Sequence, residues 1–158
     1  MPVDDQIMKT LRIPQQQPNV GKLVGMRLTS AGPGIATFEM ECDERHHNPM
    51  GSVHGGILAD LADAAMGYAV ISTLSKDETF TTIELKINFL RPVFEGKLRC
   101  HGRVDSRGKT IAYATADVVN EDRKAVAKAV STNLIVKRTG DTDAFHHRPR
   151  EDSGLRPA

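Results

Sequence analysis

The sequence predicts an α+β domain in which an antiparallel sheet of five to six strands wraps around one long central helix. The first observation is the segment 54–74, where large apolar residues fall on nearly every face at helical spacing. A helix that is apolar all round is buried. The second observation is that the chain around this segment offers mainly strand signals up to residue 137. A curved sheet rolled around the helix is the economical way to bury it.

The segment before the central helix predicts one short helix and two strands. Apolar residues at helical spacing favour a helix over residues 4–13. Two strands are expected next, over 22–30 and 34–41, joined by a hairpin-like turn at 31–34. Residues 42–53 then form a polar loop that leads into the helix.

Four strands are predicted after the helix, and short turns join the last three of them into an antiparallel meander. Ala125–Ala129 has helical propensity, but its strand-rich surroundings favour a strand there. The predicted element order is therefore β-β-α-β-β-β-β. The four strands are expected over residues 79–90, 97–105, 110–119 and 125–136.

At 158 residues, the chain is long enough for one domain with its own core. We expect an N-terminal extension over 1–19, a folded domain over 20–138 and a polar tail over 139–158. The tail is predicted to be disordered because it offers little to bury. A single wall of sheet leaves part of the central helix uncovered, so a second copy of the chain is expected to cover it.

The composition argues against several classes of partner. A formal net charge of +1 gives no electrostatic reason to bind nucleic acid or an anionic membrane. Asp60 and Asp63 inside the apolar segment argue against a membrane span, and the start of the chain lacks the features of a signal peptide. Cys42 and Cys100 form no CxxC pair, which favours two free thiols in a reducing compartment. The protein is therefore expected in the cytoplasm.

The central helix begins with Gly55 and Gly56, which indicates a place for a substrate oxygen. Helix N-termini present unpaired N–H groups and the positive end of the helix dipole. Two glycines leave this end sterically open, as an oxyanion hole requires. The alternative is that the glycines only make the turn from loop to helix.

Two carboxylates, Asp60 and Asp63, share one face of the helix. A carboxylate in an otherwise apolar helix is costly unless it is paired or functional. Asp60 lies near the helix start, where the dipole stabilises a negative charge. Asp63 lies further along, where that stabilisation fades, so Asp63 is the better candidate for the working acid.

Two stretches carry a family resemblance: NPMGSVHGG over Asn48–Gly56 and LAD over Leu61–Asp63. Together they strongly resemble hotdog-fold acyl-CoA thioesterases of the phenylacetate-pathway type, and the strand over Thr82–Pro92 is similar to that family as well. The resemblance covers about residues 20–137. It implies a hotdog fold and hydrolysis of an acyl- or aryl-acyl-coenzyme A to the free acid and coenzyme A, with no cofactor.

The resemblance implies a role for each matching residue. Asp63 matches the catalytic carboxylate, acting as nucleophile or as base on water, and Gly55 matches the residue whose N–H polarises the thioester carbonyl. Asn48 matches a residue that positions substrate or water, and His54 matches the motif histidine, an orienting residue. Thr82 falls where relatives carry Ser or Thr near the attacking water.

Other residues are less directly matched. Gly56 is expected to contact substrate at the open helix start. Arg91, Arg107 and Lys109 are candidates to meet the phosphates of coenzyme A, although isolated surface cations also serve solubility. Asp60 falls where some relatives carry an uncharged residue, so its role stays open.

Metal and serine chemistry are not expected. His46, His47 and His54 with Asp43 match no standard zinc-ligand spacing, and the plainer interpretation is a polar loop. The sequence contains no Gly-x-Ser-x-Gly elbow for a serine nucleophile.

Two functions of different classes remain, an enzyme and a non-catalytic acyl-CoA-binding hotdog protein. A pure binder has no need of a buried Asp63, which favours the enzyme. Gly55 and Asp63 are eight residues apart in the sequence, which places them about 12 Å apart along a helix. One straight helix cannot bring both to one carbonyl, but two antiparallel copies can. The family resemblance points the same way, to a homodimer with shared active sites and to a dimer of dimers.

Overall fold

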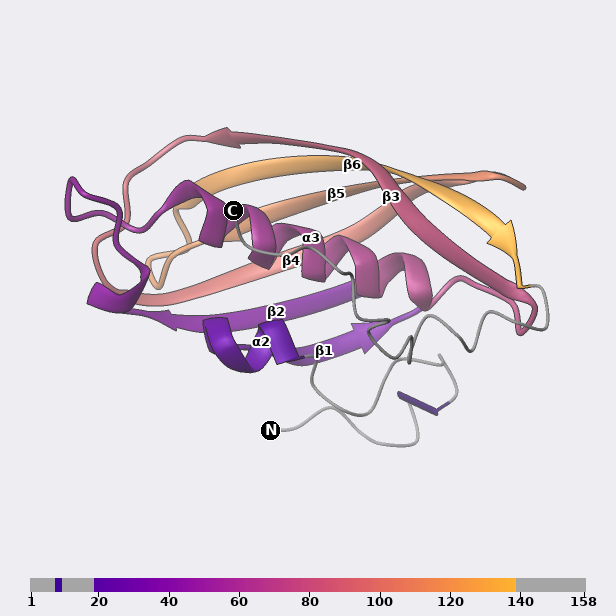
Figure 1. The fold of residues 1–158 in the computed structure, drawn as a ribbon, viewed down its shortest axis with the longest axis horizontal. Helices are drawn as coiled ribbons and strands as arrows, with labels where there is room; N and C mark the ends of the chain where they lie inside the picture. Colours follow the sequence, from indigo (N-terminus) through magenta and orange to yellow (C-terminus); the bar gives the residue numbers. More distant parts are fainter. Residues whose placement is uncertain (1–7, 10–18, 139–158) are drawn as a thin grey trace, which may run out of the picture.

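The computed structural model of the protein describes residues 8–9 and 19–138. Six antiparallel strands form one sheet that curls around a long helix, as Figure 1 shows. The predicted hotdog arrangement is confirmed. In chain order the elements are α2 (Asn19–Val24), β1 (Met26–Gly32), β2 (Ile35–Cys42), the 3₁₀ turn η1 (Glu44–His46), α3 (Gly55–Ile71), β3 (Glu78–Phe89), β4 (Gly96–Arg107), β5 (Ile111–Val119) and β6 (Ala125–Lys137).

The strand order across the sheet is β1-β2-β4-β5-β6-β3. The predicted meander of β4, β5 and β6 is confirmed, and Ala125–Ala129 belongs to a strand. The connection through α3 carries the chain across the concave face, so that β3 pairs with the far edge of the meander. This arrangement makes β1 and β3 the two edge strands.

The predicted strand over 22–30 is wrong at its beginning. Residues Asn19–Val24 form a helix, and β1 begins only at Met26. Gly25 ends this helix with φ +83, and its N–H donates to the carbonyl oxygen of Gly21 at 2.9 Å. A glycine in the left-handed region is a common helix stop. The helix has six residues, too few for a clear apolar periodicity.

Two predictions concern the ends of the chain. The polar tail over 139–158 lies outside the described residues. So does most of the predicted helix over 4–13, of which only Met8 and Lys9 are described; both are helical, and Met8 is buried.

Helix α3 ends at Ile71, three residues earlier than the predicted end at residue 74. The Ser72 hydroxyl donates to the carbonyl oxygen of Ala69 at 2.7 Å, and the Thr73 hydroxyl donates to that of Val70 at 2.7 Å. Such local side-chain bonds satisfy the last carbonyl groups in place of further helical turns.

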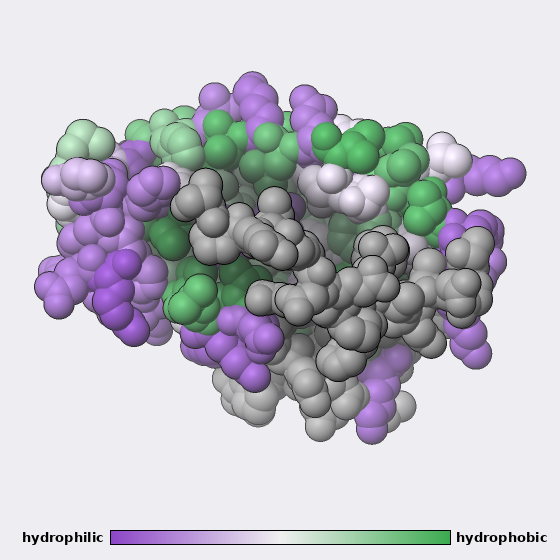
Figure 2. Space-filling view, in the orientation of Figure 1, coloured by the Kyte–Doolittle hydropathy of each residue, from purple (hydrophilic) through white to green (hydrophobic). Residues whose placement is uncertain are grey.

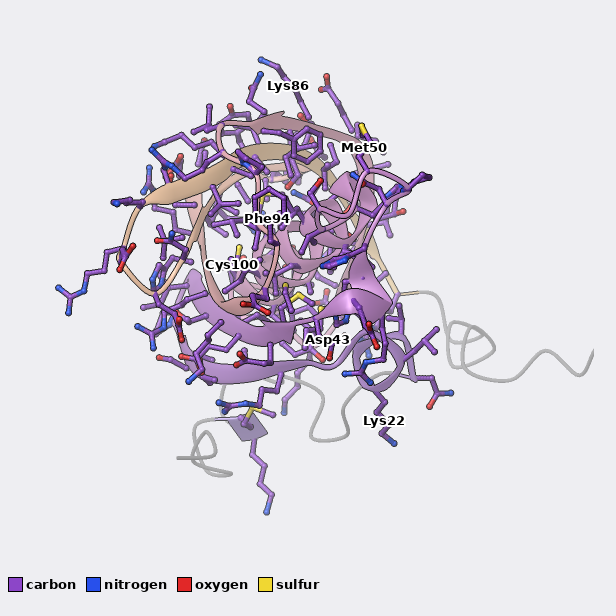
Figure 3. All side chains as sticks on the ribbon, turned by 90° about the vertical axis from the view of Figure 1, so that its left-hand side faces the viewer. Lys22, Asp43, Met50, Lys86, Phe94 and Cys100 are labelled. Carbon is purple, nitrogen blue, oxygen red and sulfur yellow. The ribbon has the colours of Figure 1, made fainter. Side chains whose placement is uncertain are left out.

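The core lies between α3 and the concave face of the sheet. Leu61, Met66 and Val70 from α3 are completely buried. Helix and sheet lie close together at Gly102 on β4, where a Cβ atom would lie 2.4 Å from the backbone carbonyl group of Ala65. The end-on view in Figure 3 shows the curl of the sheet around the helix, with Cys100 inside it.

The sheet of one chain leaves part of α3 uncovered, as predicted. The expectation of a buried Asp63 is wrong for the single chain, in which Asp63 is exposed and Asp60 is partly buried. The edge strand β3 exposes Ile83 and Phe89, at 57% and 55%, and Figure 2 shows hydrophobic surface along the side where Figure 1 places β3. Among the described residues, no helix is long and apolar enough to cross a membrane.

Candidate active site

The start of α3 offers one open backbone donor. His54 caps the helix, and its Nδ1 accepts a hydrogen bond from the N–H of Gly56 at 2.8 Å. A Cβ atom on Gly56 would lie 2.9 Å from that Nδ1, so the cap needs a glycine there. The N–H of Gly55 has no acceptor among the described residues. The dipole and the geometry of this helix start therefore favour an oxygen ligand at Gly55.

The loop before the helix is held by Asn48. Its Oδ1 accepts from the N–H groups of Met50 at 2.9 Å and Ser52 at 3.3 Å, and its Nδ2 donates to the Ser52 hydroxyl at 3.0 Å. The turn also needs Gly51, which has φ +80. An amide nitrogen carries two hydrogens, so Asn48 keeps one N–H for a further partner.

A cavity of about 430 Å³ opens beside the helix start. The ring of Phe89 lies over Gly55, because a Cβ atom there would meet its Cζ at 2.8 Å. Asn48 and Gly55, which are predicted to act on the same substrate, both line this cavity. Its full lining is Asn48, Ser52, Val53, Gly55, Leu58, Phe89, Leu90, Arg91, Pro92 and Val93.

A second cavity, of about 440 Å³, contains Asp63. Asp63 remains exposed at its mouth, yet the protein atoms around the carboxyl group displace water and raise its pKa. Burial and the charge of Asp63 also raise the pKa of Asp60. The cavity is lined by Ala59, Asp60, Asp63, Thr82, Ile83, Glu84 and Leu85.

A β-bulge in β3 forms the wall of the Asp63 cavity. The pairing of β3 with β6 shifts register between Thr82 and Glu84, which leaves Ile83 as the extra residue. Thr82 pairs with Asn133 in the register, and its hydroxyl donates to Asn133 Oδ1 at 3.1 Å. Thr82 is half-buried beside this cavity, whereas Ile83 is exposed.

The chain thus brings the predicted site residues together in two groups. Asn48 and Gly55 share one cavity, and Asp63 and Thr82 share the other. The eight residues between Gly55 and Asp63 correspond to about 12 Å along the axis of α3. A carbonyl bound at the N–H of Gly55 is therefore out of reach of Asp63 in the same chain.

Comparison with known proteins identifies the family. Residues 50–127 match the model of the thioesterase superfamily. A Saccharolobus solfataricus protein, provisionally named an esterase, is 30% identical, over 78% of this chain and 82% of its own. Human acyl-coenzyme A thioesterase 13 is 29% identical, over 78% of this chain and 86% of its own. This chain belongs to the thioesterase superfamily. Its function is accordingly the hydrolysis of a thioester.

A solved structure agrees with this membership. The PaaI protein from the phenylacetic acid degradation operon of E. coli superimposes with a TM-score of 0.76 and 26% identity. The match covers 84% of this thioesterase and 94% of that chain. The predicted resemblance to thioesterases of the phenylacetate-pathway type is confirmed.

The three predicted phosphate-binding cations of the thioesterase are not together. Arg91 lines the cavity beside Gly55, and its Nη1 donates to the carbonyl oxygen of Ala125 at 2.5 Å. Arg107 forms an ion pair with Glu78 at 2.8 Å, beyond the far end of α3. Lys109 is exposed in the turn after β4. Of the three, only Arg91 lies beside a cavity that holds a predicted site residue.

The histidines of the 42–53 loop have structural partners. His46 is buried; its Nδ1 accepts from the N–H of Asp43 at 3.1 Å, and its Nε2 donates to the carbonyl oxygen of Val24 at 2.9 Å. His47 Nε2 donates to the carbonyl oxygen of Phe94 at 2.5 Å. The described residues contain no group of three or more metal-ligating side chains.

Two buried polar residues behind the Asp63 cavity, Ser131 and Asn133, were not predicted from the sequence; they are 1% and 0% exposed. Asn133 Nδ2 donates to the Ser131 hydroxyl at 2.9 Å. A signal was present, because both interrupt the small and apolar residues on the inward face of β6. Polar residues at inward positions of a buried strand need partners, which is reason to examine them.

Proposed function

We propose that this thioesterase hydrolyses an acyl- or aryl-acyl-coenzyme A at sites shared between two copies of the chain. The observation that carries the proposal is the division of Gly55 and Asp63 between two cavities of one chain. The substrate class is supported by the names of the human acyl-coenzyme A thioesterase and of the E. coli phenylacetic acid protein.

The chemistry follows from the groups in the two cavities. The thioester carbonyl oxygen accepts a hydrogen bond from the N–H of Gly55, which stabilises the negative charge that develops during attack. Asp63 either attacks the carbonyl carbon or removes a proton from an attacking water, and coenzyme A leaves as the thiolate. Asn48 offers its remaining N–H to substrate, while His54 and Gly56 maintain the helix start through their hydrogen bond.

A two-fold dimer joins the two halves of the site. Two α3 helices that lie antiparallel place the start of one beside the middle of the other. The uncovered side of α3 and the unpaired outer edge of β3 are available to a second copy, and the exposed Ile83 and Phe89 favour burial there. We further propose that two such dimers form a tetramer.

The remaining parts of the proposal concern coenzyme A and the compartment. Arg91, at the cavity beside Gly55, is the best placed of the predicted cations to meet a phosphate; Arg107 and Lys109 remain candidates from a neighbouring copy. Cys42 and Cys100 are free and buried, which supports a cytoplasmic protein.

The test is thiol release from a panel of acyl-coenzyme A esters with aryl, short, medium and long acyl groups. Asp63→Asn should reduce kcat at least about 100-fold, because general-base or nucleophilic catalysis contributes that much or more. Asp60→Asn is the matched control, the same substitution on the same helix and cavity, and should stay within about tenfold of wild type.

Three outcomes would contradict the proposal. Tight binding of the esters without thiol release would make the protein a binder. Equal losses in the two variants would remove the distinction between Asp63 and Asp60. Activity that is lost on treatment with a chelator and restored by zinc would refute the metal-free mechanism.

A further inference from the structure

The hydroxyl group of Thr82 lies between two acceptors. It is 3.1 Å from Asn133 Oδ1, and it lines the same cavity as the Asp63 carboxyl group. A hydroxyl carries one hydrogen and two lone pairs. Thr82 can therefore donate to Asn133 or to Asp63, but not to both.

The surroundings of Asn133 decide which acceptor receives the hydrogen. Asn133 is completely buried, and its amide group faces the backbone carbonyl oxygen of Ala112 at 3.4 Å, because the two residues are partners in the β5–β6 register. A carbonyl oxygen only accepts, so the NH₂ end of the amide must face Ala112. The oxygen end then faces Thr82. A buried amide oxygen left without a donor is costly, whereas the exposed Asp63 carboxylate can accept from solvent, which keeps the Thr82 hydrogen on Asn133.

The consequence is that Thr82 turns its lone pairs toward the Asp63 cavity. An ionised Asp63 is also only an acceptor. Two acceptors that converge on one space suit a molecule with two hydrogens to give, which is water. The other charged groups on this cavity are Asp60 from α3 and Glu84 from β3, and both accept as well. The residues that β6 places behind Thr82, Ser131 and Asn133, are uncharged.

We propose that Asn133 is a positioning residue for the hydrolytic water, acting by fixing the Thr82 hydroxyl as an acceptor. This inference rests on the proposed function. The water gives one hydrogen bond to Asp63 and the other to Thr82, so that its oxygen lone pair points away from both and toward the thioester. During attack, the water's O–H bond that points to Asp63 breaks and its proton moves to the carboxylate. The water oxygen bonds to the carbonyl carbon. The C–S bond then breaks, and the proton on Asp63 passes to the thiolate.

The first experiment follows the Asp63 carboxyl carbon by ¹³C NMR during a pH titration, with the signal assigned by its loss in Asp63→Asn. In Asn133→Leu the freed Thr82 hydroxyl donates to the carboxylate, so the pKa of Asp63 should fall. In the double variant Thr82→Val/Asn133→Leu no hydroxyl remains, and the fall should disappear. Ser131→Ala is the matched control, because it removes one bond to Asn133 but leaves Ala112 to orient the amide; it should not lower the pKa.

The second experiment measures kcat, KM and their pH dependence. Asn133→Leu should lower kcat about tenfold with little change in KM, since orienting water matters only during attack. The acidic limb of its kcat/KM profile should move to lower pH. Thr82→Ser, which keeps a hydroxyl, should retain most of the activity that Thr82→Val loses.

The proposal is overturned if Asn133→Leu leaves the Asp63 titration unchanged, or if the double variant still shows the fall. If Asn133→Leu does not fold, Thr82→Val decides. If the Thr82 hydroxyl donates to Asp63, Thr82→Val should raise the pKa of Asp63 relative to Thr82→Ser. The proposal expects no such rise. The titration needs no substrate, so a wild-type protein without thiol release contradicts the proposed function and leaves this test intact.

Discussion

The shared site predicts that two inactive chains restore each other's activity. The two variants are Asp63→Asn, which removes the carboxylate, and Gly55→Pro, which removes the N–H. Proline is tolerated in the first helical turn, and His54 before it is already extended, with φ −62 and ψ 133. In a mixed dimer one site pairs an intact Gly55 with the partner's intact Asp63, and the other site carries both lesions.

The expected recovery follows from this geometry. Random mixing makes half of the dimers mixed, and half of the sites in each are intact, so about a quarter of wild-type activity should return if the chains exchange freely. Thiol release is measured after the two variants are refolded together, with differently tagged chains to count the mixed dimers.

The control for this experiment is Gly55→Ala. Its Cβ atom meets the same Phe89 ring, which lies 2.8 Å from the Cβ position, but it keeps the N–H. Gly55→Ala should therefore be much more active than Gly55→Pro. Mixed dimers that are present but inactive would refute the shared site.

Two further predictions concern stability. Burial raises the pKa of Asp63, so the folded chain binds this proton more tightly than the unfolded chain, and stability falls as pH rises between the unfolded and the folded pKa. Asp63→Asn should therefore melt at a higher temperature than wild type at pH 7 and lose this advantage near pH 3. Calorimetry at both pH values checks this, and a lower melting temperature of the variant at pH 7 would contradict the reasoning. Gly102→Ala should push on the Ala65 carbonyl group, 2.4 Å away, and melt about 3–10 °C below wild type. The control is Gly67→Ala, whose Cβ would lie 3.5 Å from Phe80; its free energy of unfolding should rise by about 0.5–1 kcal/mol. Equal effects of the two substitutions on stability would refute the close approach of Gly102 to Ala65.

The long elements could be predicted because each carries its own pattern. The apolar segment that became α3 and the strands of the meander are long, periodic and bounded by turn residues. Ala125–Ala129 shows the limit of local preference, because pairing with β5 and β3 makes a strand of a segment with helical propensity. Helix α2 was not predicted, since a helix of six residues is too short to show an apolar periodicity in the sequence.

The site was predictable only in part. The positions of Gly55 and Asp63 on one helix follow from their spacing, and so does their separation. The bulge at Ile83 and the pairing of Thr82 with Asn133, 51 residues apart in the chain, depend on the register between β3 and β6. No local pattern specifies that register, which is why the contact between Thr82 and Asn133 emerged only from the fold.

The most direct test of the shared site is a crystal structure of the protein with a ketone analogue of an acyl-coenzyme A, which cannot be hydrolysed. We expect the analogue's carbonyl oxygen about 3 Å from the N–H nitrogen of Gly55 in one copy. We expect the partner's Asp63 about 3.5 Å from the carbonyl carbon, or joined to it through one water that also contacts Thr82. A carbonyl that is held by Gly55 and Asp63 of the same chain, or that lies away from Gly55, would refute the shared site.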